Sequence, residues 1–494
     1  MTILAQILAN EGDGVAVVVG DRAIRYAQFL ADIRSAAAMF ADQGVGIGTK
    51  VGLRAGPLLT GQSYASWVAH LATLWIGARH ISMVEAGSVS DCIAAGVVEI
   101  AIGSQLGLKR VPATHRQIRF DLDLDGLRNS EGAAPKLAED QAVRINLTSG
   151  TTGRAKFVAW DAAMMEQRVA QIAEGLSLSP ESRLFPLLQM RTTAGFRYPI
   201  AIWQVGGSVL LPEDEQALAR DHRALGKSNI LLCSPPQLED RLRVHQGDWD
   251  GKEGRTIVTL GGRLGTAVRD EAMARACGRL LISYGATETG SIAIGDAGAI
   301  DRHPGAVGFV RKGIEVEIVG DDGRIVPPGT SGMIRTRSNV MAMGYEPTEI
   351  GSSNDNAPFQ HGWFVPGDLG CLFEDGLLAI EGRASDTFNL GGWKVNAQEL
   401  EQRMQIIRGV QDICACVMQL DEGDLLTFAL VCQDEQAIPS IAKQIQKLLL
   451  KGRRFHVVRV RALPRNAMGK IPRAMIAQKL TQAYQAKKKN IANA

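Results

Sequence analysis

The alternation of helical and strand-like apolar segments is the sequence feature that most constrains the fold. Within residues 23–44, apolar side chains recur at steps of three and four residues, at Ala27, Leu30, Ile33, Ala37 and Phe40. This is the spacing of one buried helix face. A glycine-containing break at 44–48 and a short apolar segment at 51–53 follow, and similar alternation continues to about residue 310. The pattern predicts an α/β fold, in which helices are layered on mostly parallel sheets.

A change of pattern after residue 310 predicts a small β region. Residues 314–319 alternate apolar and polar side chains, which is typical of a strand with one buried face. The residues 321–323 favour a turn, and 333–336 is expected to pair back on the first strand.

A second boundary is expected near residues 382–386. At 494 residues the chain exceeds one ordinary core, so at least two domains are expected. We assign 1–383 to a large N-terminal domain and 384–494 to a small, mobile α+β domain. The elements expected in the small domain are two helices and two apolar strands, at 397–407, 439–450, 413–418 and 425–431.

Composition excludes several classes of protein. The net charge of +2 gives no reason to expect a nucleic-acid or membrane-surface partner. The most apolar stretch, 64–78, is short and contains His70, so a buried helix fits it better than a membrane span. Residues 1–10 contain no Lys or Arg, and Glu11 and Asp13 follow soon after, which is unlike a secretory signal. The seven cysteines show no disulfide spacing, so a reducing cytoplasm is expected. Cys414 and Cys416 would face one side of a strand and pack in a core.

Residues 145–156 form the strongest local feature. An apolar strand runs into six consecutive glycine, serine or threonine residues at 148–153, and Arg154 and Lys156 follow. Glycine lets the backbone approach a ligand closely, and hydroxyl and N–H groups donate to phosphate oxygens. The spacing is not that of a Walker A loop. Taken alone, the segment fits either a phosphate-binding loop or a plain surface loop.

The same segment resembles the signature loop of the adenylate-forming (ANL) superfamily, which comprises acyl- and aryl-CoA synthetases, adenylation domains of peptide synthetases, and luciferases. Further motifs resemble those of the family in the same order along most of the chain: 21–26 with 44–51, the adenine loop 260–264, the YGxTE motif 284–288, residues 344–345 and 362–364 before 367–370, the hinge motif 382–386 with 391–392 and Glu399, and the lysine motif Pro464, 469–470 and Arg473.

The resemblance implies a site for ATP and Mg²⁺. Thr287 would contact the α-phosphate region and Glu288 would hold Mg²⁺, a hard cation suited to carboxylate. Tyr284 would stack on adenine. The residues implied to surround the phosphates, base and ribose are Thr148, Ser149, Gly150, Thr151, Thr152, Gly153, Lys156, Gly261, Gly262, Arg263, Gly285, Ala286, Asp368 and Arg383.

The resemblance also implies a catalytic lysine on a moving domain. Lys470 would bridge the incoming carboxylate and the α-phosphate as charge spreads in the transition state. Ser385 stands at the hinge, about which the small domain would swing between two poses. In the second pose Gly391 and Gly392 would line a channel for a pantetheine arm. A solvated loop is the alternative for Lys470, and a tight turn is the alternative for the two glycines.

Several positions depart from the family's usual residues. Pro366 lacks the hydroxyl common before Gly367, Ser385 replaces a charged hinge residue, and Asn389 replaces a frequent lysine. These departures bear mainly on the second half-reaction.

The segment 186–196 occupies the family's acyl-pocket region and contains no acidic residue, which argues against an α-amino acid substrate. Met190, Gly195 and Phe196 would suit an apolar or aromatic acyl group. Arg191 would recognise a second carboxylate or a polar substituent, or would lie on the surface. The identity of the acid stays open.

The expected activity is ATP-dependent formation of an acyl-adenylate, with release of pyrophosphate and acyl transfer to a thiol. Coenzyme A is the first choice of acceptor, and the phosphopantetheine of a carrier protein is the alternative. Transfer to an amine and a non-catalytic nucleotide-binding scaffold are further alternatives. The expected partners are a small carboxylic acid and CoA or an acyl carrier protein, with the chain as a monomer or homodimer.

Overall fold

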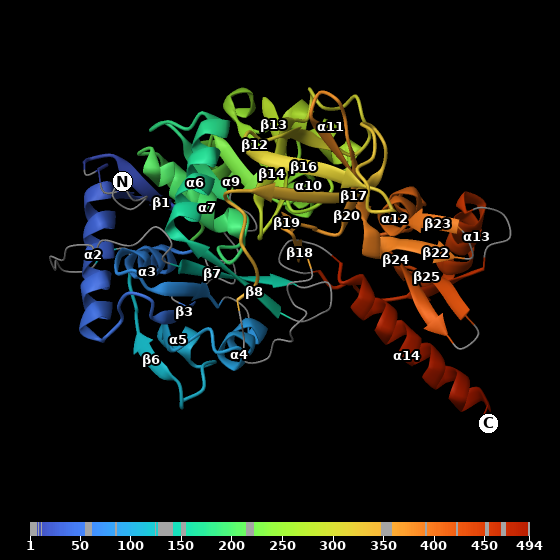
Figure 1. Ribbon diagram of the computed structural model, residues 1–494, viewed down its shortest axis with the longest axis horizontal. Helices are drawn as coiled ribbons and strands as arrows, with labels where there is room; N and C mark the ends of the chain where they lie inside the picture. Colours follow the sequence, from blue (N-terminus) through green and yellow to red (C-terminus); the bar gives the residue numbers. More distant parts are fainter. Residues whose placement is uncertain are drawn as a thin grey trace. The chain divides into compact units, whose positions relative to one another are not determined.

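The computed structural model describes residues 7, 9–10, 12–54, 62–83, 86–123, 125–126, 142–149, 155–213, 222–346, 358–390, 393–420, 423–449, 454–465 and 471–492. The chain divides into two compact units (Figure 1). The first unit comprises Met1–Val316 and Thr336–Phe364, and the second comprises Glu317–Arg335 and Val365–Ala494.

The first unit contains a large sheet whose middle strands are parallel. In spatial order its strands are β2 (Arg22–Arg25), β1 (Val15–Val19), β10 (Ser208–Leu211), β9 (Arg183–Pro186), β11 (Ile230–Cys233), β12 (Thr256–Leu260), β13 (Arg279–Ala286), β14 (Gly290–Asp296) and β15 (Ala306–Val310). Strands β1 to β13 in this order run parallel, and β2, β14 and β15 are antiparallel additions. Strand β11 is buried along its length, as parallel strands with both faces covered usually are.

A second sheet of six strands lies in the same unit. In spatial order its strands are β6 (Arg116–Arg119), β5 (Ile100–Gly103), β3 (Lys50–Arg54), β4 (Arg79–Ser82), β7 (Ala142–Ser149) and β8 (Ala155–Asp161). All neighbours are parallel except β7 and β8, which are antiparallel. The antiparallel pair brings Thr148 opposite Lys156, on either side of the segment expected to bind phosphate.

The helices of the first unit cover these sheets (Figure 1). They are α2 (Tyr26–Asp42), α3 (Tyr64–Trp75), α4 (Ala86–Ala94), α5 (Gln105–Leu108), α6 (Ala162–Leu176), α7 (Thr193–Gln204), α9 (His222–Lys227), α10 (Pro235–Val244), α11 (Thr266–Arg275) and the 3₁₀ turn η1 (Lys252–Gly254). Helix α2 begins later than expected, because residues 22–25 pair with β1 as a strand.

Side-chain caps and an aromatic cluster fix α3, α6 and α7. Asp161 accepts a hydrogen bond from the Met164 N–H at the start of α6, and Thr192 accepts one from the Gly195 N–H at the start of α7. The rings of Trp67 on α3 and Trp203 on α7 lie edge to face with centroids 4.9 Å apart, and both side chains are fully buried. The expected buried helix at 64–78 is therefore confirmed as α3.

The expected small β region is present. Its strands are β16 (Ile314–Val319), β17 (Gly332–Ser338), β18 (Phe359–Gln360), β19 (Trp363–Phe364), β20 (Asp368–Leu372) and β21 (Leu377–Arg383). Strands β20 and β21 form an antiparallel pair in the second unit, with Asp368 directly opposite Arg383.

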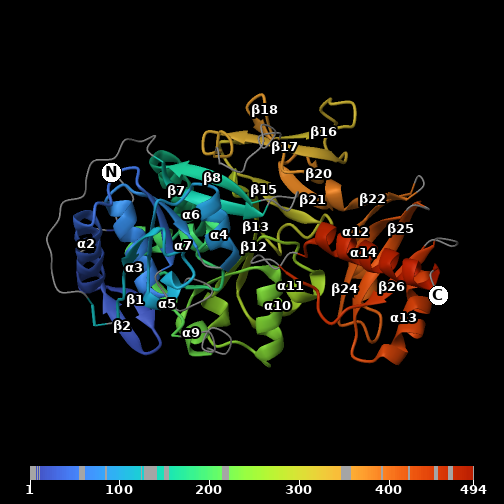
Figure 2. The same ribbon diagram turned by 90° about the horizontal axis from the view of Figure 1, so that it is seen from below.

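The remainder of the second unit is an α+β structure (Figure 2). Its elements are η2 (Ala384–Asp386), β22 (Thr387–Leu390), β23 (Trp393–Asn396), α12 (Ala397–Gln405), β24 (Asp412–Leu420), β25 (Gly423–Val431), η3 (Glu435–Ala437), α13 (Ile438–Leu448), β26 (Phe455–Arg459) and α14 (Arg473–Ala492). The strand order is β24-β25-β26. One face of this sheet packs against α12 and α13, and the other, with Cys414 and Cys416 buried in it, packs against α14.

The architecture confirms the expected α/β class with a smaller α+β part. The boundary at 383/384 and the mobility of the small domain stay predictions. Within the described part of the chain, no helix is long and apolar enough to cross a membrane.

Candidate functional site

The carboxyl ends of the parallel strands bring together several of the site residues predicted in the first unit. Residues 187–190 follow β9, Ser234 follows β11, 261–263 follow β12, and 287–288 follow β13. Parallel strands end at one edge, so these segments meet there, which is the usual place for ligands in open α/β sheets. Gln237 at the start of α10 donates a hydrogen bond to the Leu187 carbonyl, 2.8 Å away, and joins two of the segments.

The hairpin formed by β13 and β14 carries five of the predicted residues, 284–288. Tyr284 lies on β13, and Thr287 and Glu288 lie in the turn. The Cβ of any larger residue at Gly285 would collide with the Gly290 carbonyl oxygen, so this tight hairpin requires glycine there. Glu288 is only 7% exposed.

Arg168 on α6 fixes this turn from behind. Its guanidinium donates to the carbonyl oxygens of Thr287 at 3.0 Å and Glu288 at 2.7 Å, and to that of Val340 at 2.6 Å and 2.9 Å. The side chain is fully buried and lies over the ring of Trp160, 4.8 Å from the centroid. Burial and the neighbouring Arg197 lower the pKa of Arg168. One buried side chain thus joins α6, the 287–288 turn and the segment at 340.

Tyr345 connects the Glu288 carboxylate with a lysine of the β7–β8 hairpin. The Tyr345 hydroxyl donates to Glu288 Oε1 at 2.7 Å, and Lys156 Nζ lies 4.5 Å from the centre of the Tyr345 ring. The Ala342 N–H donates to the Glu288 carbonyl at 2.8 Å. A carboxylate, a hydroxyl and an ammonium group therefore lie together beside the half-buried Thr148.

Other predicted residues lie on the same elements or outside the described ones. Gly261, Gly262 and Arg263 form the partly exposed loop after β12, Ala286 ends β13, and Ser149 ends β7. The predicted residues outside the described part of the chain are Gly150, Thr151, Thr152, Gly153, Gly391, Gly392 and Lys470.

The second unit contains the predicted ribose and hinge residues. Arg383 Nε lies 3.0 Å from Asp368 Oδ1, across the β20–β21 pair. The Ala384 N–H donates to the Gly367 carbonyl at 2.9 Å, which fixes the chain just before the exposed Ser385. The pairing gives Asp368 a fixed position, and its binding of a ribose stays a prediction.

The segment predicted to form an acyl pocket is folded into the core. Met190 and Phe196 are fully buried, and Phe196 stacks on Trp67 with centroids 5.5 Å apart. A Cβ at Gly195 would collide with the Gln189 carbonyl oxygen. Arg191 Nε donates to Gln189 Oε1 at 2.6 Å and is partly exposed. Met190 and Phe196 contact protein in this structure, and the role of the segment in acid recognition stays a prediction.

A buried polar cluster lies directly behind this segment. Arg144 on β7 is fully buried with its guanidinium 3.6 Å from the centroid of the Phe196 ring. It donates to Asn146 Oδ1 at 3.0 Å and to the Met190 carbonyl at 3.0 Å. It also donates to His80 Nε2 at 2.9 Å. Burial lowers the pKa of Arg144 to about 9, so the guanidinium remains charged at pH 7.

The direction of donation in this cluster sets the histidine tautomers. Arginine only donates, so His80 must accept at Nε2 and carry its proton on Nδ1, a buried atom with no partner among the described residues. His70 Nδ1 lies 2.7 Å from the Ser66 carbonyl and must donate to it. Burial lowers the pKa of His70 to about 3, so its Nε2 carries no proton at neutral pH and accepts from the Ser82 hydroxyl at 2.7 Å. Both histidines are therefore neutral.

The site residues fit a metal-bound nucleotide. Glu288 is a nearly buried carboxylate with a fixed orientation, and Lys156 is a nearby cation. Among the described residues there is no group of three or more histidine, cysteine or carboxylate side chains that would bind a metal alone. Mg²⁺ typically takes one or two protein carboxylates and completes its shell with substrate phosphates and water, which matches this arrangement. Glu288 would hold the ion, which would neutralise phosphate charge.

The sequence alone assigned no role to three residues of the site. Arg168 has one sequence signal, because it falls on the apolar face of α6 with Met164, Met165 and Ile172. Tyr345 belongs to the motif 344–345, for which no contact was predicted. Arg144 interrupts an apolar strand just before the glycine-rich segment, but its partners His80 and Met190 are distant in sequence.

Replacement of Arg168 by methionine is predicted to destabilise the first unit. The change leaves the carbonyls of Thr287, Glu288 and Val340 without this donor. We expect the free energy of unfolding to fall by on the order of 3 kcal/mol, measured by urea unfolding. The control Arg311→Met removes a half-buried donor to the Gln171 carbonyl and should cost clearly less. A loss for Arg168→Met no larger than for this control would contradict the assigned role.

Acid is predicted to destabilise the chain through His70 and His80. Burial and the charge of Arg144 lower the pKa of His70 to about 3, and the same causes lower that of His80. The unfolded chain takes up protons near pH 6.5 that the folded chain does not, so stability falls as pH falls below about 6.5. Each histidine contributes up to about 1.4 kcal/mol per pH unit.

Urea unfolding between pH 7.5 and 5.0 measures this dependence. The variant His70→Gln keeps an amide donor and a carbonyl acceptor but does not titrate. Its stability should therefore fall less steeply with pH than that of the wild type. Equal slopes for the two proteins would show that His70 is not held neutral.

Comparison with known proteins gives the family. The family model described as AMP-binding enzyme matches residues 4–346. A medium-chain-fatty-acid–CoA ligase of Ectopseudomonas oleovorans is 24% identical over 72% of this chain and 68% of its own length. A 2-succinylbenzoate–CoA ligase of Listeria monocytogenes is 26% identical over 72% of this chain and 74% of its own. The ATP-bound structure of MatB from Rhodopseudomonas palustris has the same fold, with a TM-score of 0.83 and 21% identity over 98% of this chain and 100% of that one. Because the family model spans well over half of the sequence, this chain belongs to the family of AMP-binding enzymes.

Proposed function

We propose that the protein is an AMP-forming acid–thiol ligase that activates a carboxylic acid with ATP and transfers the acyl group to coenzyme A. The observation that carries the proposal is the contact set at the end of β13. There Glu288, Tyr345 and Lys156 lie together beside the hairpin that leads into the glycine-rich segment. Membership of the AMP-binding family supports the same conclusion.

Two steps account for the chemistry. In the first, a carboxylate oxygen of the acid attacks the α-phosphorus of ATP, the bond to the bridging oxygen breaks, and pyrophosphate leaves. In the second, the thiol sulfur attacks the acyl carbon, the thiol proton is lost, and AMP leaves with the oxygen that came from the acid. Both steps concentrate negative charge, which donors and cations must stabilise.

We assign the residues to these steps as follows. Lys156 and the residues 148–153 bind the β- and γ-phosphates, and Tyr284 faces the adenine. Lys470 stabilises the charge that develops between the carboxylate and the α-phosphate. The turn held by Arg168 presents Thr287 to the α-phosphate region and keeps the Glu288 carboxylate directed toward the metal position.

The proposal also concerns which thiol accepts the acyl group and which class of acid is activated. CoA is favoured because the ligases named above act on CoA. A carrier-protein phosphopantetheine is the alternative, and a monomeric or homodimeric cytoplasmic enzyme is the expected form. The missing acidic residue in 186–196 argues against an α-amino acid, and the identity of the acid stays open.

The proposed activity is tested by carboxylate-dependent exchange of pyrophosphate into ATP with Mg²⁺ present. Octanoate, benzoate, phenylacetate, succinate and glycine form the panel, and we expect exchange with at least one acid other than glycine. Lys470→Ala should lose roughly 100-fold or more of this exchange while still binding ATP. The matched control Lys479→Ala, on the exposed part of α14, should retain it.

Two results would contradict these assignments. Near-normal exchange in Lys470→Ala would remove the assigned role of that lysine. Binding of ATP without exchange for any acid would instead favour the non-catalytic scaffold.

A second prediction concerns Tyr345. Phenylalanine keeps the ring beside Lys156 but removes the hydroxyl that donates to Glu288. Loss of one hydrogen bond to a charged group should raise the Mg²⁺ concentration for half-maximal exchange by about 3- to 10-fold. Tyr484→Phe on α14 is the control. An unchanged Mg²⁺ requirement would show that the hydroxyl does not orient the carboxylate.

A further inference from the structure

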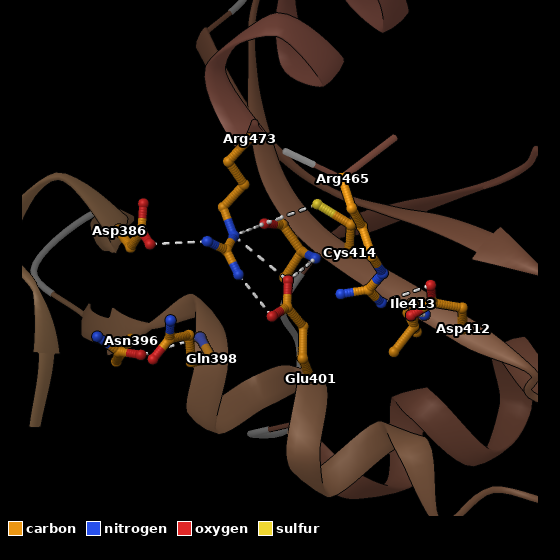
Figure 3. A network of polar contacts seen from close by, with 10 residues as sticks. Asp386, Asn396, Gln398, Glu401, Asp412, Ile413, Cys414, Arg465 and Arg473 are labelled. Atoms are coloured by element: carbon orange, nitrogen blue, oxygen red, sulfur yellow. Dashed lines mark hydrogen bonds and ion pairs between the residues drawn. The ribbon is translucent and has the colours of Figure 1, made fainter. Parts of the chain in front are cut away.

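Arg473 joins three elements of the second unit. Arg473 is the first residue of α14, and its guanidinium lies between two carboxylates (Figure 3). One terminal nitrogen lies 2.7 Å from Asp386 Oδ2, and the other lies 2.5 Å from Glu401 Oε2. Its Nε donates to the Ala415 carbonyl on β24 at 3.1 Å. The arginine thus connects η2, α12 and β24 through one planar group.

These contacts are shielded from water. The side chains of Arg473, Asp386 and Glu401 are 11%, 16% and 14% exposed. Glu401 Oε1 also accepts a hydrogen bond from the Ala415 N–H at 2.7 Å, so its carboxylate is fixed from two sides. Burial raises the pKa of Glu401, and the charge of Arg473 opposes that rise. Because ion pairs that are little exposed are screened weakly, salt should weaken this network less than it weakens a surface pair.

Asp386 and Arg473 lie close in sequence to the expected hinge residue and the expected catalytic lysine. Asp386 directly follows Ser385, the expected hinge residue, and Lys470 lies three positions before Arg473. Three peptide units span at most about 11 Å. Wherever Arg473 is fixed, the backbone of Lys470 therefore stays within that distance of it.

We propose that Arg473 is a positioning residue for adenylation, which couples the hinge carboxylate Asp386 to the segment that carries Lys470. The inference rests on the proposed function, because it assigns Lys470 to acyl-adenylate formation. With this coupling, rotation about Ser385 moves the lysine together with the hinge, and the lysine reaches the reacting atoms in one defined position. The second half-reaction does not use Lys470, so it should not depend on this network.

The chain supplies a matched control. Arg465 lies five positions before Lys470 and pairs with Asp412 at the same 2.7 Å, also visible in Figure 3. That pair is more exposed, at 38% and 29%, and the carboxylate in it, Asp412, lies on β24 and not in the hinge segment 384–386. An exposed pair of this kind contributes little. Comparison of the two arginines therefore separates coupling to the hinge from a general effect of ion pairs near the lysine.

The test measures the two half-reactions separately in the full chain. Pyrophosphate exchange with octanoate, or with the acid of the panel that the wild type uses best, reports adenylation. Thioester formation from the corresponding added acyl-adenylate and CoA reports transfer. The variants are Arg473→Lys, Asp386→Asn and the control Arg465→Lys. Asp386→Asn keeps the contacts of Arg473 with Glu401 and Ala415, so it carries the test if Arg473→Lys does not fold.

We expect Arg473→Lys and Asp386→Asn to lower kcat for exchange about 10-fold or more, with KM for ATP within about twofold of the wild type. Transfer from the added acyl-adenylate should stay within about twofold, and Arg465→Lys should match the wild type in both assays. Unchanged exchange in both test variants, or an equal fall in both half-reactions, would overturn the inference.

Amide hydrogen exchange distinguishes a failure of this inference from a failure of the proposed function. In Asp386→Asn the amides of residues 473–476, at the start of α14, should exchange faster than in the wild type, while those of β26 should not change. This measurement needs no substrate. Unchanged protection of 473–476 overturns the coupling whatever the wild type does with carboxylic acids. A wild type without pyrophosphate exchange for any acid overturns the proposed function alone.

Discussion

The buried guanidinium of Arg168 is the interaction on which the predicted site in the first unit depends. It connects α6 to the carbonyls of residues 287, 288 and 340, which are between 119 and 172 positions away in sequence. Because a buried carbonyl without a donor costs free energy, these segments are stable only in the arrangement that satisfies all of them. Glu288 and Tyr345 are therefore oriented before any substrate binds, which is the condition for electrostatic stabilisation without reorganisation.

Buried arginines serve the same structural purpose in three places. Arg144 joins β7 to His80 on β4 and to the carbonyl of Met190, and Arg473 joins η2, α12 and β24. In each case one long side chain with several donors connects segments that are distant in sequence. Arg144 and Arg168 donate to neutral groups, whereas Arg473 faces two carboxylates. The first two therefore order backbone, and the third forms a charged connection beside the expected hinge.

The alternating periodicity predicted the α/β class, the helix α3 and the buried face of Cys414 and Cys416, because burial leaves a regular spacing in sequence. The motif 284–288 lies at the end of β13, and the roles of its residues in binding ATP stay predictions. The sequence could not predict the contacts of Arg168, because its acceptors are backbone carbonyls, which every residue type carries. The burial of Met190 and Phe196 was equally hidden, since a pocket wall and a core segment have the same apolar composition.

The central claim is that the acid is activated as an acyl-adenylate. The most direct measurement uses a carboxylic acid labelled with ¹⁸O in the carboxyl group, together with ATP, Mg²⁺ and CoA, followed by mass spectrometry of the products. Attack of the carboxylate on the α-phosphorus requires one labelled oxygen to end in AMP, with unlabelled pyrophosphate released. Labelled inorganic phosphate with ADP as the nucleotide product, or AMP without label, would contradict the account.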